Sequence, residues 1–126
     1  MRYFFVQIGE HPEWLFDSLK SVQKNDSCAE IYFCGDNSMS CQGVNNINLT
    51  DIISQQTKTA FSSSVWKGDN NPLWRTSIYR IFILLDMMNS LNVDDFIHFD
   101  SDVILFHSFE SVKSSIDTSK KALHIT

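Results

Sequence analysis

The chain has 126 residues, and 10 Lys and Arg against 15 Asp and Glu give it a net charge of −5. This length predicts a single domain spanning residues 1–126, and 43% apolar residues with only 4 Gly and 2 Pro exclude disordered, collagen-like and low-complexity classes. The few basic residues are scattered, which argues against a nucleic-acid partner.

The first half of the chain alternates strand and helix patterns. Residues 3–8 are aromatic and β-branched and stop at Gly9, which predicts a buried strand. Pro12 suits the first turn of a helix that follows at 3.6-residue spacing. Apolar runs at residues 30–34 and, more weakly, 44–49 predict two further strands. Strand, helix, strand indicates a parallel α/β unit.

The second half contains the strongest helix pattern. Residues 50–71 are polar and serine-rich and predict at most one short helix. A helix is expected from Pro72, with one apolar face formed by Ile78, Ile81, Phe82, Leu85 and Met88. An apolar run over residues 96–106 then predicts a buried strand that ends at its aspartates. A short helix over residues 109–116 and a final strand over residues 122–125 complete the order.

Cysteine spacing and hydropathy bear on the compartment. Cys28, Cys34 and Cys41 match no C-x2-C metal half-site and are expected to be reduced or merely buried. The apolar start is interrupted by Gln7 and Glu10 before a signal-peptide core accumulates. No apolar stretch approaches the length of a transmembrane segment. The expectation is therefore a soluble, cytoplasmic protein.

The most informative motif is Asp100-Ser101-Asp102, at the end of an apolar run. Burying two carboxylates is costly unless a positive charge compensates them, and a divalent cation is the natural candidate. Oxygen ligands suit Mg²⁺ or Mn²⁺, which complete their shells with waters and substrate phosphates. The alternative interpretation is that both aspartates merely cap a turn or the next helix.

An arginine-bearing apolar helix at residues 77–85, followed by a strand and D-x-D at residues 96–105, resembles the nucleotide-sugar-dependent glycosyltransferases of the GT-A fold. Similar enzymes are glycogenin and the lipopolysaccharide galactosyltransferase-like proteins. Residues 6–19 are similar to the first strand and helix of these enzymes, and residues 30–37 to their second strand. The resemblance implies a Rossmann-like, mainly parallel sheet flanked by helices, and a donor that is a nucleotide diphosphate sugar, in particular a UDP-sugar.

The resemblance also implies roles for individual residues. Asp100 would reach the metal and the nucleotide ribose, and Asp102 would coordinate the Mn²⁺ or Mg²⁺ that bridges the diphosphate. Ser101 belongs to the same nucleotide-sugar-binding set. Arg80 would contact the diphosphate or the sugar, which suits a permanently charged fork of donors. The alternative for Arg80 is a solvated surface arginine.

Three further candidate nucleotide-binding residues lie at the ends of the first two predicted strands. By resemblance, Gln7 and Gly9 lie where the family holds the nucleotide base, and Asp36 lies where an acidic residue meets the ribose. Ligands of open α/β sheets bind beyond the carboxyl ends of the strands, which agrees with all three positions. A plain turn at Gly35-Asp36-Asn37 is the alternative for Asp36.

Members of this family are longer, and their acceptor-binding half and further metal ligand have no counterpart here. The resemblance thus implies the N-terminal, nucleotide-binding part of an enzyme: a fragment, a truncated relative, or a chain that needs a partner. The catalytic residue, donor sugar, acceptor and stereochemical outcome stay open.

Two other functions compete. A haloacid dehalogenase-type phosphatase also has D-x-D after an apolar strand, but that motif usually opens its domain and precedes Gly or Thr, whereas Val103 follows here. A non-catalytic nucleotide-binding or interaction module is the other alternative. Hydrolase, dinucleotide and P-loop motifs are absent from the sequence.

Overall fold

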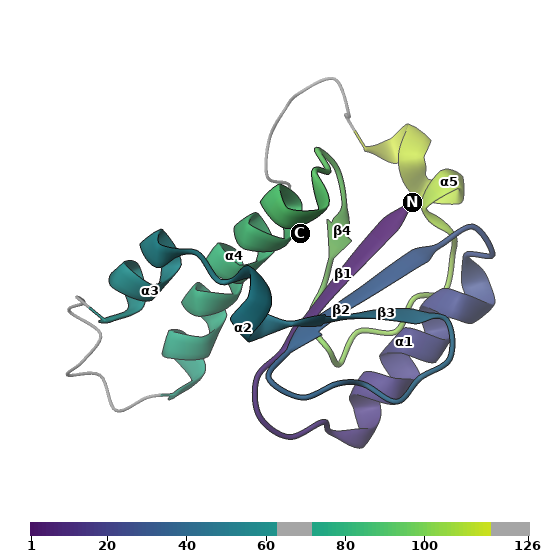
Figure 1. Cartoon of the computed structure of the whole chain (residues 1–126). Helices are drawn as coiled ribbons and strands as arrows, with labels where there is room; N and C mark the ends of the chain where they lie inside the picture. The colour runs from purple at the N-terminus through teal and green to yellow at the C-terminus, as the bar shows by residue number, and fades with distance from the viewer. Residues whose placement is uncertain (63–71, 117–126) are drawn as a thin grey trace.

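The computed structural model describes residues 1–62 and 72–116 (Figure 1). Its centre is a four-stranded sheet of order β3-β2-β1-β4 in which all three strand pairs are parallel. The strands are β1 (Arg2–Gln7), β2 (Glu30–Gly35), β3 (Val44–Asn48) and β4 (Ile97–His98). The helices are α1 (Glu13–Asn25), α2 (Leu49–Ile52), α3 (Gln55–Ser62), α4 (Pro72–Leu91), α5 (Phe109–Val112) and the 3₁₀ helix η2 (Lys113–Ser115). The predicted α/β class with a parallel sheet is confirmed, and the arrangement is compatible with a Rossmann-like fold.

Strand β1 is buried on both faces, as the central strand of a parallel sheet between helices should be. Successive side chains of a strand point to opposite faces. Tyr3 and Phe5 therefore join the core beneath α1, whereas Phe4 and Val6 join the core beneath α4 and α2. Figure 1 shows α1 and α4 on different sides of the sheet. The fold has three layers.

Helix α4 turns a different face to the sheet from the one that its apolar spacing predicted. Among residues 76–91 of α4, the buried apolar side chains are Ile83, Leu84 and Met87, and Asp86 is buried beside them. In the predicted face, Ile81 is 58% exposed and Leu85 is 50% exposed. The prediction was wrong because α4 is apolar on nearly all sides, so helical spacing fits more than one face.

The serine-rich segment after β3 contains two helices within its described part, α2 and α3, where the sequence predicted at most one. Asp86 of α4 accepts a hydrogen bond from the Ser54 backbone N–H at 3.0 Å, and the Ser54 hydroxyl accepts from the Thr57 N–H at 3.1 Å. Ser54 thereby caps the start of α3. The ring of Phe61 stacks on Tyr79 of α4 with centroids 3.8 Å apart. Tertiary contacts to α4 thus stabilise a helix that local sequence only weakly favours.

The apolar run at residues 96–106 is mostly not a strand. β4 comprises Ile97 and His98, both half-buried rather than buried. Beyond it the chain crosses to α1, whose side chains bind the main chain of residues 103–105. The Ser18 hydroxyl donates to the Val103 carbonyl at 2.6 Å, and the Leu105 N–H donates to the Ser21 hydroxyl at 2.9 Å. The predicted short helix corresponds to α5 and η2, and the predicted strand over residues 122–125 lies outside the described residues.

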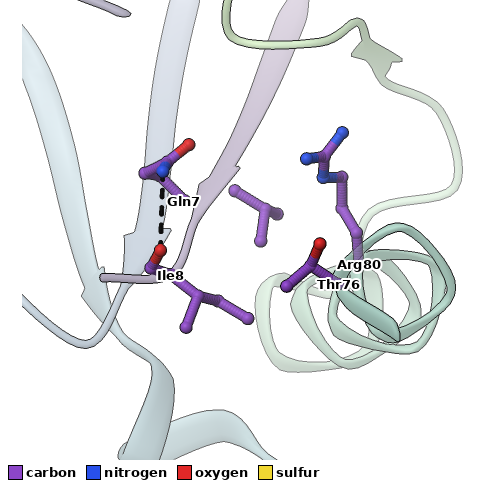
Figure 2. A pocket seen from close by; sticks show the side chains of 5 residues that line it. Gln7, Ile8, Thr76 and Arg80 are labelled. Carbon is purple, nitrogen blue, oxygen red and sulfur yellow. Dashed lines mark hydrogen bonds between the residues drawn. The ribbon is translucent and has the colours of Figure 1, made fainter. Parts of the chain in front are cut away.

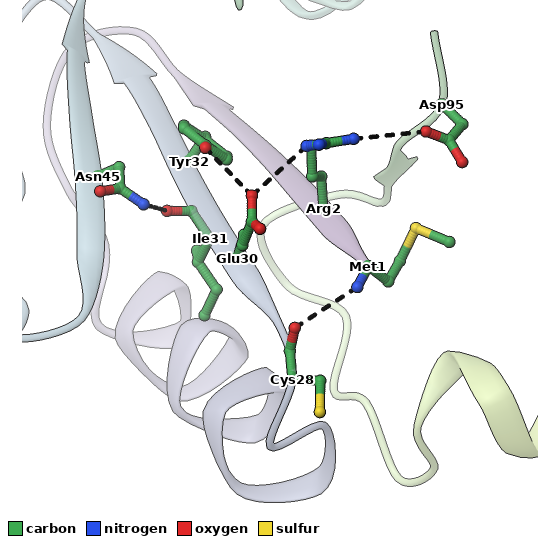
Figure 3. Close-up of polar contacts among 8 residues, drawn as sticks. All are labelled: Met1, Arg2, Cys28, Glu30, Ile31, Tyr32, Asn45 and Asp95. Atoms are coloured by element: carbon green, nitrogen blue, oxygen red, sulfur yellow. Dashed lines mark hydrogen bonds and ion pairs between the residues drawn. The ribbon is translucent and has the colours of Figure 1, made fainter. Parts of the chain in front are cut away.

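The amino ends of β1, β2 and β4 are linked by ion pairs around Arg2 (Figure 3). Arg2 Nε lies 3.4 Å from Glu30 Oε2 on β2, and Arg2 Nη1 lies 3.6 Å from Asp95 Oδ1 before β4. The Tyr32 hydroxyl also donates to Glu30, at 3.3 Å. Such solvent-accessible pairs contribute about 0–1 kcal/mol each. They lie at the amino ends of the strands, whereas the predicted site residues lie at the carboxyl ends.

The state of the cysteines and the length of the helices bear on the remaining sequence-based expectations. Cys28, Cys34 and Cys41 are all free thiols. Across residues 1–62 and 72–116, the structure contains no helix with the length and apolar character needed to cross a membrane.

Candidate functional site

The residues that the sequence singled out lie at the carboxyl ends of three strands and on α4. Gln7 ends β1, Asp36 follows β2, and Asp100 follows β4 by two residues. Arg80 comes from the middle of α4, one helical turn after Thr76. Since β1 pairs with both β2 and β4, these ends lie along one edge of the sheet. That edge is where open α/β sheets bind ligands.

An ion pair joins two of the predicted residues, Arg80 on α4 and Asp100 in the segment after β4. The Arg80 guanidinium donates from Nη1 to Asp100 Oδ1. The Arg80 side chain is 22% exposed and that of Asp100 is 66% exposed. At 100° per residue, Arg80 lies between Leu84 and Met87 on the sheet-facing side of α4. Arg80 is therefore held beside the site rather than extended freely into solvent.

Arg80 also lines a small pocket beside the end of β1 (Figure 2). The other lining residues are Val6, Gln7, Ile8 and Thr76. The Gln7 carboxamide nitrogen donates to the carbonyls of Ile8 at 3.4 Å and Glu10 at 3.1 Å. The Gln7 carboxamide oxygen has no hydrogen-bond partner within the described part of the chain. The pocket is thus lined by the Arg80 guanidinium from α4 and by Gln7, with its carboxamide acceptor, from β1.

A second pair of predicted residues meets at the ends of β1 and β2. The Gly9 N–H donates to Asp36 Oδ1 at 2.9 Å. Gly9 has a φ of +86°, a conformation that favours glycine and directs the chain out of β1. At Gly35, a Cβ would lie 2.7 Å from the Gln7 carbonyl oxygen, so only glycine allows this approach of the strands. The contact uses one carboxylate oxygen of Asp36.

The D-x-D motif itself forms a turn. The Val103 N–H donates to the Asp100 carbonyl at 3.1 Å, which closes a four-residue turn that contains Ser101 and Asp102. Asp102 is exposed and forms no ion pair with the side chains that the structure describes. The structure therefore brings Asp100 to Arg80 but leaves Asp102 open to solvent.

The donor set at this turn fits a hydrated Mg²⁺ or Mn²⁺. Both carboxylates are accessible, and Asp100 already compensates one positive charge. These cations need few protein oxygens because they retain waters and bind phosphates. Within residues 1–62 and 72–116, no three His, Cys, Asp or Glu side chains group as a metal site. The two aspartates would thus hold the ion only together with waters and a phosphate ligand.

His98 lies next to this site but is engaged by the sheet. Its Nδ1 is 2.8 Å from the Phe4 carbonyl oxygen, and since a carbonyl only accepts, Nδ1 carries the proton. Burial lowers the pKa of His98, and the neighbouring Arg80 lowers it further. The hydrogen bond to Phe4 thus fixes the ring of His98 against β1.

Cys34, in the core beneath α4, is not suited to act as a nucleophile. Burial, with a smaller contribution from the Asp86 carboxylate, raises the pKa of the Cys34 thiol to about 12. Cys34 is therefore protonated at neutral pH and acts as a small apolar side chain.

Sequence reasoning missed Thr76, Val6 and Ile8 as lining residues. Thr76 precedes Arg80 by four residues, and this helical spacing is the one signal that pairs it with the arginine. Val6 and Ile8 carry apolar side chains without any chemical signature.

No protein-family model, curated protein or solved structure matches this chain.

Proposed function

We propose that this chain is the nucleotide-binding part of a glycosyltransferase that transfers a sugar from a nucleotide diphosphate donor, in particular a UDP-sugar, to an acceptor. One observation carries the proposal: Asp100 of the D-x-D turn pairs with Arg80 of α4, beside the pocket at the end of β1. This juxtaposition joins a metal-ligand candidate to a phosphate-binding candidate at the ligand-binding edge of a parallel sheet.

The chemistry of the donor explains why carboxylates and an arginine are needed together. Departure of a nucleoside diphosphate develops negative charge on its phosphate oxygens. Mg²⁺ or Mn²⁺, held by Asp100 and Asp102, would supply Lewis-acid stabilisation of that charge. The Arg80 guanidinium has five N–H donors, enough to bind a phosphate in a bidentate manner.

The remaining residues would orient the nucleoside. The free carboxamide oxygen of Gln7 can accept a hydrogen bond from a base N–H, as the imide of uracil offers. Asp36 uses Oδ1 to hold Gly9, which leaves Oδ2 to accept from ribose hydroxyls. Ser101 lies between the two aspartates in the D-x-D turn, and its hydroxyl adds a polar group to this part of the site. Together these groups account for a base, a ribose and a diphosphate.

Isothermal titration of the chain with UDP, with Mn²⁺ and then with a chelator, tests the proposal. We expect binding that depends on Mn²⁺. Asp102→Ala should weaken the Mn²⁺-dependent UDP affinity by about 10- to 100-fold or more, because one of only two protein ligands is lost. The melting temperature should be unchanged, since Asp102 is exposed.

Asp94→Ala is the matched control. Asp94 is also exposed but precedes β4, at the opposite end of the strand. It should bind UDP as the wild type does. Unchanged affinity in Asp102→Ala, or equal losses in both variants, would show that the metal assignment is wrong.

A non-catalytic nucleotide-binding module is the second candidate, and the exposed apolar side chains of α4 favour it. Ile81, Phe82 and Leu85 face solvent on one side of the helix, and apolar groups that gather on a surface mark interaction sites. Turnover distinguishes the two functions. Release of free sugar or transfer to an acceptor from a UDP-sugar supports the enzyme, whereas UDP binding without turnover supports the module.

A further inference from the structure

Arg80 lies between the Asp100 carboxylate and the pocket at the end of β1, and its guanidinium is paired with the carboxylate. Its Nη1 binds the Asp100 carboxylate, and its side chain forms one wall of the pocket that Gln7 lines from the other side (Figure 2). The residue that would bind a diphosphate therefore neutralises the carboxylate that would bind a metal.

The ion pair and the two ligands exclude one another. A divalent cation at Asp100 Oδ1 would lie against the guanidinium, and like charges at contact distance repel. A diphosphate in the pocket would draw the guanidinium to itself, because it carries more negative charge than one carboxylate. Each ligand thus requires that Arg80 and Asp100 separate.

We propose that the Arg80–Asp100 ion pair couples metal binding to diphosphate binding. With neither ligand present, the pair is mostly closed, and each apparent affinity is the intrinsic affinity multiplied by the fraction of molecules in which the pair is open. Whichever ligand binds first opens the pair and leaves the other residue ready for the second ligand. The coupling is positive and reciprocal, as linkage requires. The inference rests on the function proposed above.

The coupling is modest in size because the pair is accessible to solvent. Asp100 is 66% exposed, and ion pairs of this kind change an equilibrium constant by up to about fivefold. A purely structural pair makes a different prediction: its loss would lower stability without raising the affinity of the site for either ligand.

The test measures UDP binding in chelator, where no metal contributes. Asp100→Asn removes the partner of Arg80 and should raise the metal-free UDP affinity by up to about fivefold over the wild type. Asp102→Asn removes the same charge from the same turn without touching the ion pair, so it sets the size of the charge effect alone. We expect Asp100→Asn to bind UDP more tightly than Asp102→Asn.

Equal UDP affinities of these two variants in chelator would overturn the coupling. If the wild type still binds UDP with Mn²⁺, the proposed function survives that result. If the wild type binds no UDP with or without Mn²⁺, both proposals are wrong.

A second measurement decides the question should Asp100→Asn not fold. Arg80→Gln, titrated with Mn²⁺ alone, should bind the ion up to about fivefold more tightly than the wild type. Arg2→Gln removes an arginine at the opposite edge of the sheet, where it pairs with Glu30 and Asp95, and should leave Mn²⁺ affinity unchanged. Arg80→Gln that binds Mn²⁺ no more tightly than the wild type would contradict the proposal.

Discussion

At the scale of single residues, His98 links the sheet to the candidate site. Its Nδ1–H donates to the Phe4 carbonyl, while Arg80 and Asp100 act on it electrostatically. Desolvation dominates, so the pKa of His98 is lowered in the folded state. The unfolded chain, with a histidine pKa of about 6.5, then binds a proton more tightly than the folded chain.

This difference predicts how stability depends on pH. Stability is fully present above about pH 6.5 and falls as the pH drops from there through the lower folded-state pKa of His98. One proton limits the slope to about 1.4 kcal/mol per pH unit. His98→Asn retains a donor for Phe4 but does not titrate, so its free energy of unfolding should fall less between pH 7.5 and 5.5.

Chemical denaturation at several pH values measures this slope. His107→Asn is the control, since His107 is exposed, and it should keep the slope of the wild type. A slope that is the same in His98→Asn and in the wild type would rule out His98 as its source.

At the scale of elements, α4 shows that an apolar residue in a helix is not necessarily a buried one. Ile83 is fully buried on the sheet, whereas Ile81, two residues earlier, is 58% exposed. Truncation of a buried isoleucine leaves a cavity, and truncation of an exposed one does not. The two positions therefore form a matched pair on one helix.

Ile83→Ala should lower the free energy of unfolding by about 2–5 kcal/mol. Ile81→Ala should change it by no more than about 0.5 kcal/mol. Urea denaturation of both variants measures the difference. A larger loss in Ile81→Ala than in Ile83→Ala would mean that α4 buries the face that its sequence spacing predicted. Comparable losses would contradict the difference in burial between the two positions.

At the scale of the whole molecule, α1 holds the chain beyond the D-x-D turn. The Ser21 hydroxyl accepts from the Leu105 N–H and donates to the Ser18 carbonyl, and the Asn25 carboxamide donates to the Leu105 carbonyl at 2.8 Å. Asp26 accepts from the Tyr3 hydroxyl at 2.8 Å and from the Phe109 N–H at 3.4 Å. The bonds to Leu105 and Phe109 span 80 to 84 residues of sequence. They therefore fix the position of the chain that follows the D-x-D turn.

Ser21→Ala should lower the free energy of unfolding by about 1–3 kcal/mol, because the Leu105 N–H loses its partner in a partly buried place. Ser27→Ala, at an exposed position just beyond α1, should change it by less than about 0.5 kcal/mol. Both values come from denaturant titrations. Equal effects would show that the Ser21 contact contributes nothing to the tertiary structure.

Local patterns were sufficient for β1, α1, β2 and β3, and for the place of D-x-D after a strand. Each of these depends on information within a few residues: alternation of faces in β1, helical spacing in α1, and glycine at the ends of β1 and β2. The carboxyl-edge location of Gln7, Asp36 and Asp100 follows from a parallel sheet, which the order of elements already indicates.

Contacts between distant residues were needed for the rest. An almost uniformly apolar helix gives no preferred face, so only packing against Phe4 and Val6 selects Ile83 over Ile81. Helix α3 depends on Asp86, and the course of residues 103–105 depends on α1, in both cases through bonds that no local pattern contains. The pairing of Arg80 with Asp100 is likewise decided in three dimensions, because the rotation of α4 determines which charge meets the turn.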